Sequence, residues 1–365
     1  MRYIFYGMII LVAVLALVLL GQVIYWGCRI FVCKHTAALI HWSALGCVAV
    51  VLIVASLWGN LVTRFQLDVN RVDVVSENVP EDFDGYRIAQ ISDLHLDWFD
   101  SVQGRSFIDR LADSIAAEKP DIIVFTGDLV TIQSAEAEPF RKALARLANL
   151  PLQSSSKGQE SSSIPVYSIL GNHDYADYTR MSARERYNDV EHLCQLQRET
   201  GWKLLRNESV LLLRNSSNIQ LIGVENIGEP PFSTYGDLKK AMATEHTQPS
   251  DSNFQTSPHF GEIEGGFKIL LSHNPTHWRS EVLPTTNIDL MLAGHTHAVQ
   301  IRIVNWSPAK WKYPEWGGLY SVIGTNRPQY LYVNTGIGGV GPRIRIGVPP
   351  ELTILTLRRP STKKE

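Results

Sequence analysis

The chain has 365 residues, a formal net charge of −2, 45% hydrophobic residues and 19% charged residues. This length accommodates one large domain or two smaller ones. The near-neutral charge excludes a broad basic surface, so we expect no nucleic-acid partner. The four cysteines do not form a disulfide framework, because Cys28, Cys33 and Cys47 lie in or beside an apolar N-terminal region and leave Cys194 alone.

The N-terminal region contains two long uncharged stretches, residues 3–26 and 36–61. A helix of about 20 apolar residues crosses a bilayer, so each stretch is long enough. We therefore expect two N-terminal transmembrane helices joined by a short polar segment that contains Arg29 and Lys34. A cleaved signal peptide is the alternative, which the length of the first stretch and the presence of the second disfavour.

Two spans place both ends of this anchor on the same side of the membrane. Arg2, Arg64 and Arg71 lie on that side, and Arg29 and Lys34 lie on the other. The positive-inside rule therefore slightly favours a cytoplasmic position for the rest of the chain. The expected location is the inner (cytoplasmic) membrane, with more than one span.

From about residue 66, short apolar runs alternate with amphipathic segments, which is typical of a layered α/β architecture. The apolar runs predict strands at residues 87–91, 121–126, 166–170, 220–224, 267–271, 288–293 and 330–333. Helical spacing of apolar residues predicts helices at residues 107–117, 137–147 and 183–200. Two polar stretches, residues 154–163 and 245–264, are expected to be surface insertions.

Five short motifs rich in metal-binding side chains follow predicted strands, where ligand sites of α/β sheets gather. The motifs are DLH with Asp93 and His95, GD with Asp128, GNHD with Asn172, His173 and Asp174, SHNP with His273, and GHTH with His295 and His297. DLH or GD alone is also common in helix caps and turns. GNHD has no obvious packing role, and GHTH is expected to place two imidazoles on one side of a short extended segment.

Carboxylate, amide and imidazole ligands together suit manganese, iron or zinc better than calcium. Two such ions about 3.5–4 Å apart can hold a phosphoryl group and activate a bridging water as hydroxide. A shared carboxylate brings the two cations that close, and we expect Asp128 to be the bridge because motifs before and after it offer ligands for one ion each. The sequence therefore predicts metal-assisted hydrolysis of a phosphoester, with manganese as the first choice of metal.

The ordered series of motifs resembles the signature of the calcineurin-like metallophosphoesterases from about residue 79 to residue 357. The segments FDGYRIAQISDLHLD and NTGIGGVGPRIRIGVPPELTILTL are similar to the membrane-associated bacterial branch of that family. This branch includes enzymes that cleave the pyrophosphate of UDP-2,3-diacylglucosamine in lipid A synthesis. The resemblance implies a two-sheet α/β sandwich flanked by helices.

The resemblance also implies a role for each motif residue. Asp93, His95 and His297 would bind the first metal, Asn172, His273 and His295 the second, and Asp128 would bridge them. His173 would donate a hydrogen bond or a proton to the phosphate or the leaving group. Asp174 would orient His173, as carboxylates do for imidazoles.

We expect a membrane anchor at residues 1–62, a linker at 63–78, a metallophosphoesterase domain at 79–358 and a tail at 359–365. The expected function is hydrolysis of a phosphoester or phosphoanhydride at the membrane, and a lipid-linked nucleotide diphosphate such as UDP-2,3-diacylglucosamine is the first candidate substrate. A phosphodiesterase acting on a soluble substrate and a non-catalytic scaffold are the alternatives. The complete ligand set argues against the scaffold, and no obligate protein partner is evident.

Overall fold

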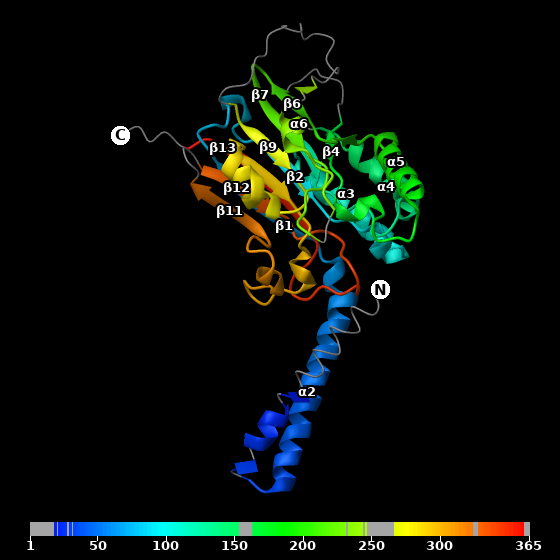
Figure 1. Cartoon of the computed structure of the whole chain (residues 1–365), viewed down its shortest axis with the longest axis vertical. Coiled ribbons are helices and arrows are strands. Elements are labelled where there is room, and N and C mark those ends of the chain that lie inside the picture. Colours follow the sequence, from blue (N-terminus) through cyan, green and yellow to red (C-terminus); the bar gives the residue numbers. More distant parts are fainter. Residues whose placement is uncertain are drawn as a thin grey trace, which may run out of the picture.

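The structure, a computed structural model, describes residues 18–360 apart from residues 20, 28, 31, 153–162, 231–232, 244, 247–265 and 324–327. Two mixed β-sheets pack face to face with helices on their outer faces, and one long helix extends away from this globular part (Figure 1). The α/β architecture expected from the sequence is confirmed. The two polar stretches expected as insertions lie almost entirely outside the described residues.

The first sheet has six strands in the order β1-β13-β2-β3-β4-β5. Their bounds are Asp68–Val75 (β1), Glu351–Arg358 (β13), Arg87–Ile91 (β2), Ile122–Phe125 (β3), Val166–Ser168 (β4) and Lys203–Leu204 (β5). Strands β2 to β5 are parallel, whereas β13 runs antiparallel to β2. The carboxyl ends of β2, β3 and β4 therefore meet at one edge.

The second sheet has seven strands in the order β11-β12-β10-β9-β7-β6-β8. Their bounds are Gly318–Ile323 (β11), Pro328–Val333 (β12), Leu290–Ala293 (β10), Lys268–Leu271 (β9), Ser217–Gly223 (β7), Glu208–Arg214 (β6) and Glu245–His246 (β8). Strands β12, β10, β9 and β7 are parallel, and hairpin-type antiparallel pairs flank them.

The central strands are continuously apolar because both of their faces are buried. In β3, Ile122 and Val124 belong to the core between the two sheets. Ile123 and Phe125 point the other way, into the core under the helices. This alternation is the period of two that a pleated strand imposes on its side chains.

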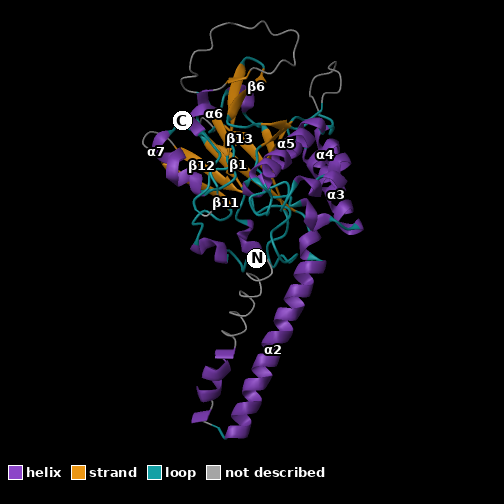
Figure 2. Ribbon diagram, turned by 45° about the vertical axis from the view of Figure 1, so that its right-hand side comes forward, coloured by secondary structure: helices purple, strands orange, loops and turns teal. Residues whose placement is uncertain are grey.

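Helices cover the outer face of each sheet (Figure 2). The first sheet is covered by α3 (Val102–Glu118), α4 (Arg141–Ala148) and α5 (Ala183–Glu199), and the second by α6 (Leu238–Ala243) and by the turns Trp278–Val282 and α7 (Leu283–Thr285). Ser101 and Ser182 start α3 and α5 as N-caps, accepting hydrogen bonds from Gly104 and Glu185. Short 3₁₀ turns occur at Thr63–Phe65, Glu81–Phe83, Leu96–Phe99, Ser134–Glu136, Glu138–Phe140, Asn172–Tyr175, His297–Gln300 and Pro308–Trp311.

The long helix α2 (Lys34–Leu61) is the single helix among the described residues that is long and apolar enough to cross a membrane. Its 28 residues span about 42 Å at 1.5 Å per residue. The first expected span, residues 3–26, falls mainly outside the described residues, so one of the two expected spans is found. Helical residues 21–27 do pack beside α2, where Nδ1 of His41 donates to the Gly21 carbonyl at 2.6 Å.

The end of α2 is hydrogen-bonded to the Gly-rich loop at residues 336–350. Arg345 donates its backbone N–H to the Gly59 carbonyl at 3.2 Å, and the Asn60 side chain donates to the Arg343 carbonyl at 2.6 Å. The interval 63–78, expected as a linker, contains β1, which pairs with all eight residues of β13. β1 lies at the edge of its sheet and is mostly half-buried, so its sequence lacks the continuous apolar run by which the central strands were predicted.

We expect Gly59→Ala to destabilise the protein, since a Cβ there would lie 2.8 Å from the Arg345 carbonyl oxygen and 2.8 Å from Ile344 Cγ2. Such a clash with backbone costs about 1–3 kcal/mol. Gly46→Ala is the matched control on the same helix, because its Cβ would have none of the described atoms within 4 Å. Thermal unfolding in detergent should show a lower Tm for Gly59→Ala alone, and equal Tm values would contradict the contact.

Candidate metal centre

The motif residues leave their strands through left-handed turns. Backbone φ is 53° at Asp93, 42° at His95, 61° at Asp128, 73° at His295 and 49° at His297. Each left-handed residue other than glycine costs about 1–2 kcal/mol. Such strain persists only where surrounding contacts hold it, and it is concentrated at functional sites. The GHTH segment is therefore a turn, which corrects the expectation that it is extended.

Glycines allow these turns to approach one another. Gly127 has φ of 97°, and a Cβ on it would lie 2.6 Å from Gly171 N and 2.9 Å from His273 Nδ1. A Cβ on Gly294 would lie 2.3 Å from Asp93 Oδ2. Any larger residue at these positions would push the ends of β3, β4 and β10 apart.

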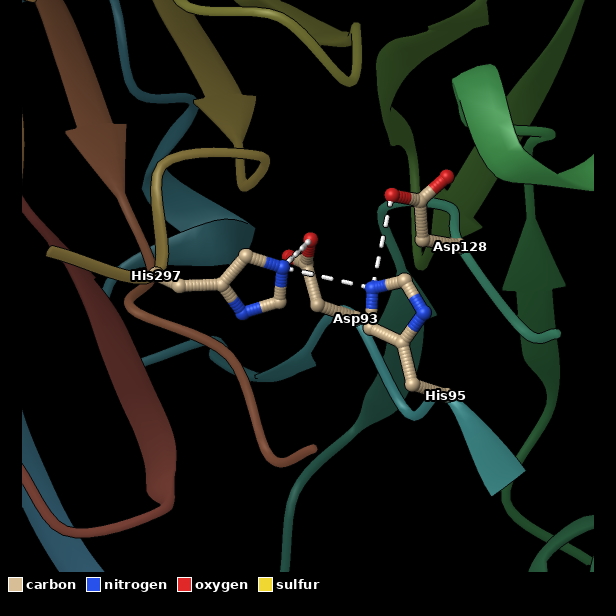
Figure 3. Close-up of side chains that lie close together, drawn as sticks. All are labelled: Asp93, His95, Asp128 and His297. Atoms are coloured by element: carbon tan, nitrogen blue, oxygen red, sulfur yellow. Dashed lines mark hydrogen bonds and ion pairs between the residues drawn. The ribbon is translucent and has the colours of Figure 1, made fainter. Parts of the chain in front are cut away.

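The first group of potential ligands comprises Asp93, His95, Asp128 and His297, whose ligand atoms all lie within 4.8 Å of one another (Figure 3). All four residues are buried. His297 Nε2 lies 3.2 Å from Asp93 Oδ1 and 3.2 Å from His95 Nε2, which is itself 3.5 Å from Asp128 Oδ2. Two carboxylates and two imidazoles thus converge on one point.

The second group comprises Asp128, His273 and His295. His273 Nε2 lies 3.2 Å from Asp128 Oδ2 and 3.2 Å from His295 Nδ1. Asn172 adds a neutral oxygen, because its Oδ1 lies 3.1 Å from the same His273 nitrogen. Asp128 belongs to both groups, so the structure brings together all seven residues that the sequence proposed as ligands.

Hydrogen bonds on the outer side of the rings orient the imidazoles. His273 Nδ1 lies 2.8 Å from the Thr126 carbonyl, so this nitrogen is the donor and Nε2 is left facing the site. His295 Nε2 lies 2.9 Å from the Tyr313 hydroxyl, and His95 Nδ1 lies 3.2 Å from Thr131 Oγ1. Partners of this kind fix the ring orientation of metal-binding histidines.

The electrostatics favour deprotonated imidazoles. Burial lowers the pKa of His95, His295 and His297 well below its ordinary value, so these rings are neutral at pH 7. Burial also lowers the pKa of His273, but the Asp128 carboxylate outweighs burial and raises it to about 9. Burial raises the pKa of Asp93 to about 7.

These residues fit divalent cations. Imidazole nitrogens lie 3.2 Å apart in two pairs, His95 with His297 and His273 with His295, and two carboxylates are buried beside them. Cations in the two groups would be ligated by these nitrogens, with loss of the His273 proton, and would neutralise the buried carboxylates. The mixture of nitrogen and oxygen ligands matches the preference of first-row transition metals.

His173 lies at the edge of the site, partly exposed. Its Nδ1 is 2.7 Å from the Thr131 carbonyl oxygen. The ring is edge-on to His95, with centroids 5.0 Å apart, and packs on Tyr178 at 4.5 Å. The His173 ring therefore lies beside the first group of potential ligands.

Asp174 does not contact the His173 ring as the sequence led us to expect. Its carboxylate accepts hydrogen bonds from four backbone N–H groups, those of Asp128 (2.9 Å), Leu129 (2.9 Å), Val130 (3.1 Å) and Gly171 (2.9 Å). It therefore fixes the turn after β3, which ends at the Thr131 carbonyl that contacts His173. Asp174 and the His173 ring are thus connected through the backbone of this turn.

Three residues near the site were missed by the sequence analysis: Tyr178, Tyr313 and Thr131. The Asn172 amide donates to the Tyr178 hydroxyl at 2.9 Å, which turns its Oδ1 toward His273. Tyr178 lies four residues after the GNHD motif, so its place in the sequence could have indicated that it is near the site. Tyr313 contacts His295 from 18 residues away, and nothing in the sequence marks it.

The comparisons with known proteins agree with this geometry. Residues 86–299 match the family model described as calcineurin-like phosphoesterase. The chain belongs to the calcineurin-like phosphoesterase family. It is therefore a metallophosphoesterase, a hydrolase acting on phosphoester bonds.

Three relatives are similar along most of this chain. A Bos taurus transmembrane protein with metallophosphoesterase domain is 29% identical over 80% of this chain and 57% of its own length. The UDP-2,3-diacylglucosamine pyrophosphatase LpxG of Chlamydia trachomatis is 27% identical over 82% of this chain and 91% of its own length. The metallophosphoesterase YkuE of Bacillus subtilis is 28% identical over 78% and 83%. The chain thus spans little more than half of the bovine relative and nearly all of the chlamydial one.

We predict that metal binding strengthens as pH rises. A metal must displace the proton of His273 below pH about 9 and also that of Asp93 below about 7. Each displaced proton changes the apparent affinity by up to about tenfold per pH unit, so the slope steepens below pH 7. Titration of the metal-free protein with manganese across this range measures the slope. His192→Gln, away from the site, should leave the slope unchanged, and a flat profile would contradict the assignment.

We predict that Asp174→Asn destabilises the protein by about 2–3 kcal/mol, because the NH2 that replaces one oxygen would face two buried backbone N–H donors and cannot accept from them. Metal affinity should fall with it, since the same turn positions Asp128. Asp189→Asn is the control, because Asp189 is half-buried and its recorded hydrogen bonds, among the described residues, are with Ser134. Urea unfolding and bound-metal analysis give the two readouts. Normal metal content in a destabilised Asp174→Asn protein would show that Asp174 stabilises the fold without affecting metal binding.

Proposed function

We propose that this protein is a membrane-anchored phosphohydrolase with a dinuclear metal centre that cleaves a phosphoester or phosphoanhydride bond. The observation that supports it most strongly is that Asp128 belongs to both ligand groups. Asp93, His95 and His297 would complete one metal site, and Asn172, His273 and His295 the other. Manganese is the first choice, with iron or zinc as alternatives.

When bound, two such ions polarise phosphoryl oxygens and lower the pKa of water between them. The side chains of this protein supply the rest. Asp128 would offer its carboxylate to both sites, and the neutral rings of His295 and His297 would provide lone pairs without adding charge. His173, held by the Thr131 carbonyl, is placed to donate a hydrogen bond or a proton to the phosphate or the leaving oxygen.

The proposed substrate is a lipid-linked nucleotide diphosphate such as UDP-2,3-diacylglucosamine. Two findings support it: the similarity to the chlamydial pyrophosphatase along nearly all of that enzyme, and the apolar helix α2 joined to the catalytic domain. A soluble phosphodiester is the rival substrate. It is favoured only by the general ability of this fold to take many phosphoesters.

We further propose that residues 1–62 form a two-span hairpin that anchors the domain in the inner membrane. The contact of Gly21 with His41 supports a helix running back along α2. Arg2, Arg64 and Arg71 would lie on one side and Arg29 and Lys34 on the other, a slight bias that favours a cytoplasmic domain by the positive-inside rule. The catalytic unit then extends from β1 at Asp68 to β13 at Arg358, and a short tail follows it.

We predict that His173→Ala retains metal but lowers turnover by about 10²–10⁴-fold, the usual contribution of a positioned acid. Asp128→Ala should lose both metal and turnover, since it removes a ligand from each group. Hydrolysis of bis-p-nitrophenyl phosphate with added manganese, together with metal analysis, distinguishes the two variants. Full activity of Asp128→Ala would overturn the mechanism.

The substrate is tested separately on the full chain in mixed micelles. We expect release of a uridine nucleotide from UDP-2,3-diacylglucosamine, and loss of that release in Asp128→Ala. Hydrolysis of bis-p-nitrophenyl phosphate without any action on the lipid substrate would favour the soluble phosphodiester. Metal binding without either activity would point to a scaffold.

A further inference from the structure

Residues 299–312, here called the interfacial loop, expose an unusual set of apolar side chains. The exposed fractions are 52% for Val299, 61% for Ile303, 84% for Val304, 37% for Trp306 and 82% for Trp311. The loop begins directly after the GHTH motif. Such a patch beside a functional site indicates a contact with a partner or a membrane.

The loop presents these side chains from a rigid base. Ile303 and Trp306 exchange backbone hydrogen bonds of 2.8 and 3.1 Å, which close a tight turn with Val304 near its tip. Val304 has φ of 55°, an uncommon and costly conformation for a β-branched residue. Ser307, fully buried, donates its hydroxyl to the Ala298 carbonyl at 2.5 Å and fixes the base. An exposed valine in a strained turn indicates that the apolar tip is required there.

The interfacial loop is connected to the end of the anchor helix. Arg302 donates its backbone N–H to the Ile346 carbonyl at 2.8 Å, and Ile346 donates to the Gln300 carbonyl at 2.9 Å. The adjacent Arg345 donates to Gly59 on α2. Figure 1 shows these loops at the end of the domain from which α2 emerges. The loop therefore lies at the level where the apolar helix ends.

An apolar groove of about 390 Å³ lies between the anchor and this end of the domain. Val51, Val54 and Trp58 of α2 line one wall, and Ile346 and Gly347 line the other. The groove therefore lies between the apolar surface of α2 and the segment around Ile346, which is hydrogen-bonded to the interfacial loop. Its apolar lining suits an acyl chain.

The composition of the loop matches a membrane interface better than a protein surface. Between residues 299 and 312 there are two tryptophans, three basic residues (Arg302, Lys310 and Lys312) and no acidic residue. Tryptophan concentrates at the level of lipid headgroups, and basic side chains attract anionic lipids. Because the apolar helix α2 ends beside the interfacial loop, the loop would lie at the level of the lipid headgroups.

We propose that the interfacial loop inserts into the membrane leaflet nearest the domain, next to α2, as a second membrane contact. Two contacts fix the tilt of the domain, so the metal-binding end of the two sheets faces the bilayer. A phosphate group carried by a lipid then reaches the site without leaving the interface. The membrane contact itself does not depend on which phosphoester is cleaved.

The test measures the depth of Val304 in vesicles. The full chain, with Cys28, Cys33 and Cys47 replaced by alanine, bears Val304→Cys labelled with an environment-sensitive fluorophore and is reconstituted in phosphatidylcholine with a minority of phosphatidylglycerol. Insertion to about 5–10 Å predicts strong quenching by lipids with a doxyl group near the headgroup. Quenching by aqueous iodide should be weak.

The control position is Leu213, an apolar residue exposed by 47% on β6. It lies next to the turn into β7, which runs parallel to β9, so it is at the opposite end of the sheet from His273. A label on Leu213→Cys should be quenched by iodide and not by lipid. Identical behaviour of the two labels would overturn the proposal, and crosslinking of Val304→Cys to itself would assign the loop to a second copy of the chain.

A second variant separates membrane contact from chemistry. Val304→Asn removes the apolar tip with a residue that tolerates the left-handed conformation. With Trp311→Ser, it should raise KM for a substrate embedded in vesicles by about tenfold while kcat for bis-p-nitrophenyl phosphate stays unchanged. Unchanged KM for the embedded substrate would contradict the functional role, and absence of all activity would count against the proposed function while the quenching result still decides the insertion.

Discussion

The site depends on one buried carboxylate, that of Asp128, which lies against imidazoles from both sheets. An isolated carboxylate in this interior would be very costly, and burial alone would raise its pKa. The imidazoles of His273, His173 and His95 outweigh burial and hold the pKa of Asp128 well below its ordinary value. Strand ends from both sheets must therefore converge around it, which explains why the connecting turns are strained and rich in glycine.

Asp174 stabilises this arrangement from behind. By accepting four backbone N–H groups, it fixes the turn after β3 and the start of the turn after β4 in one network. Buried networks of this kind are either fully satisfied or destabilising. The position of His173 is thus determined by backbone geometry, through Thr131, and not by a direct ion pair.

The sequence predicted the parts of this protein that have a simple pattern. Strands β2, β3, β4, β9 and β10 are short and buried, so mostly apolar runs predicted them, and the motifs after them contain all seven potential metal ligands. Edge strands such as β1 and β11 consist mostly of half-buried and exposed residues, so they lack a continuous apolar run and were missed. The left-handed turns and the contact of Tyr313 with His295 depend on distant segments, and local propensity does not encode them.

The contacts of Arg345 couple the orientation of helix α2 to that of the metal centre. Its guanidinium is fully buried and donates to the carbonyls of Thr335, Gly336 and Gly338, while its backbone N–H donates to α2. A Cβ on Gly336 would lie 2.8 Å from Asp93 Cβ, so the same loop touches the ligand shell. The loop around Arg345 therefore contacts both helix α2 and the metal-ligand residue Asp93. A rotation or a change of tilt of α2 would therefore also rotate the metal centre.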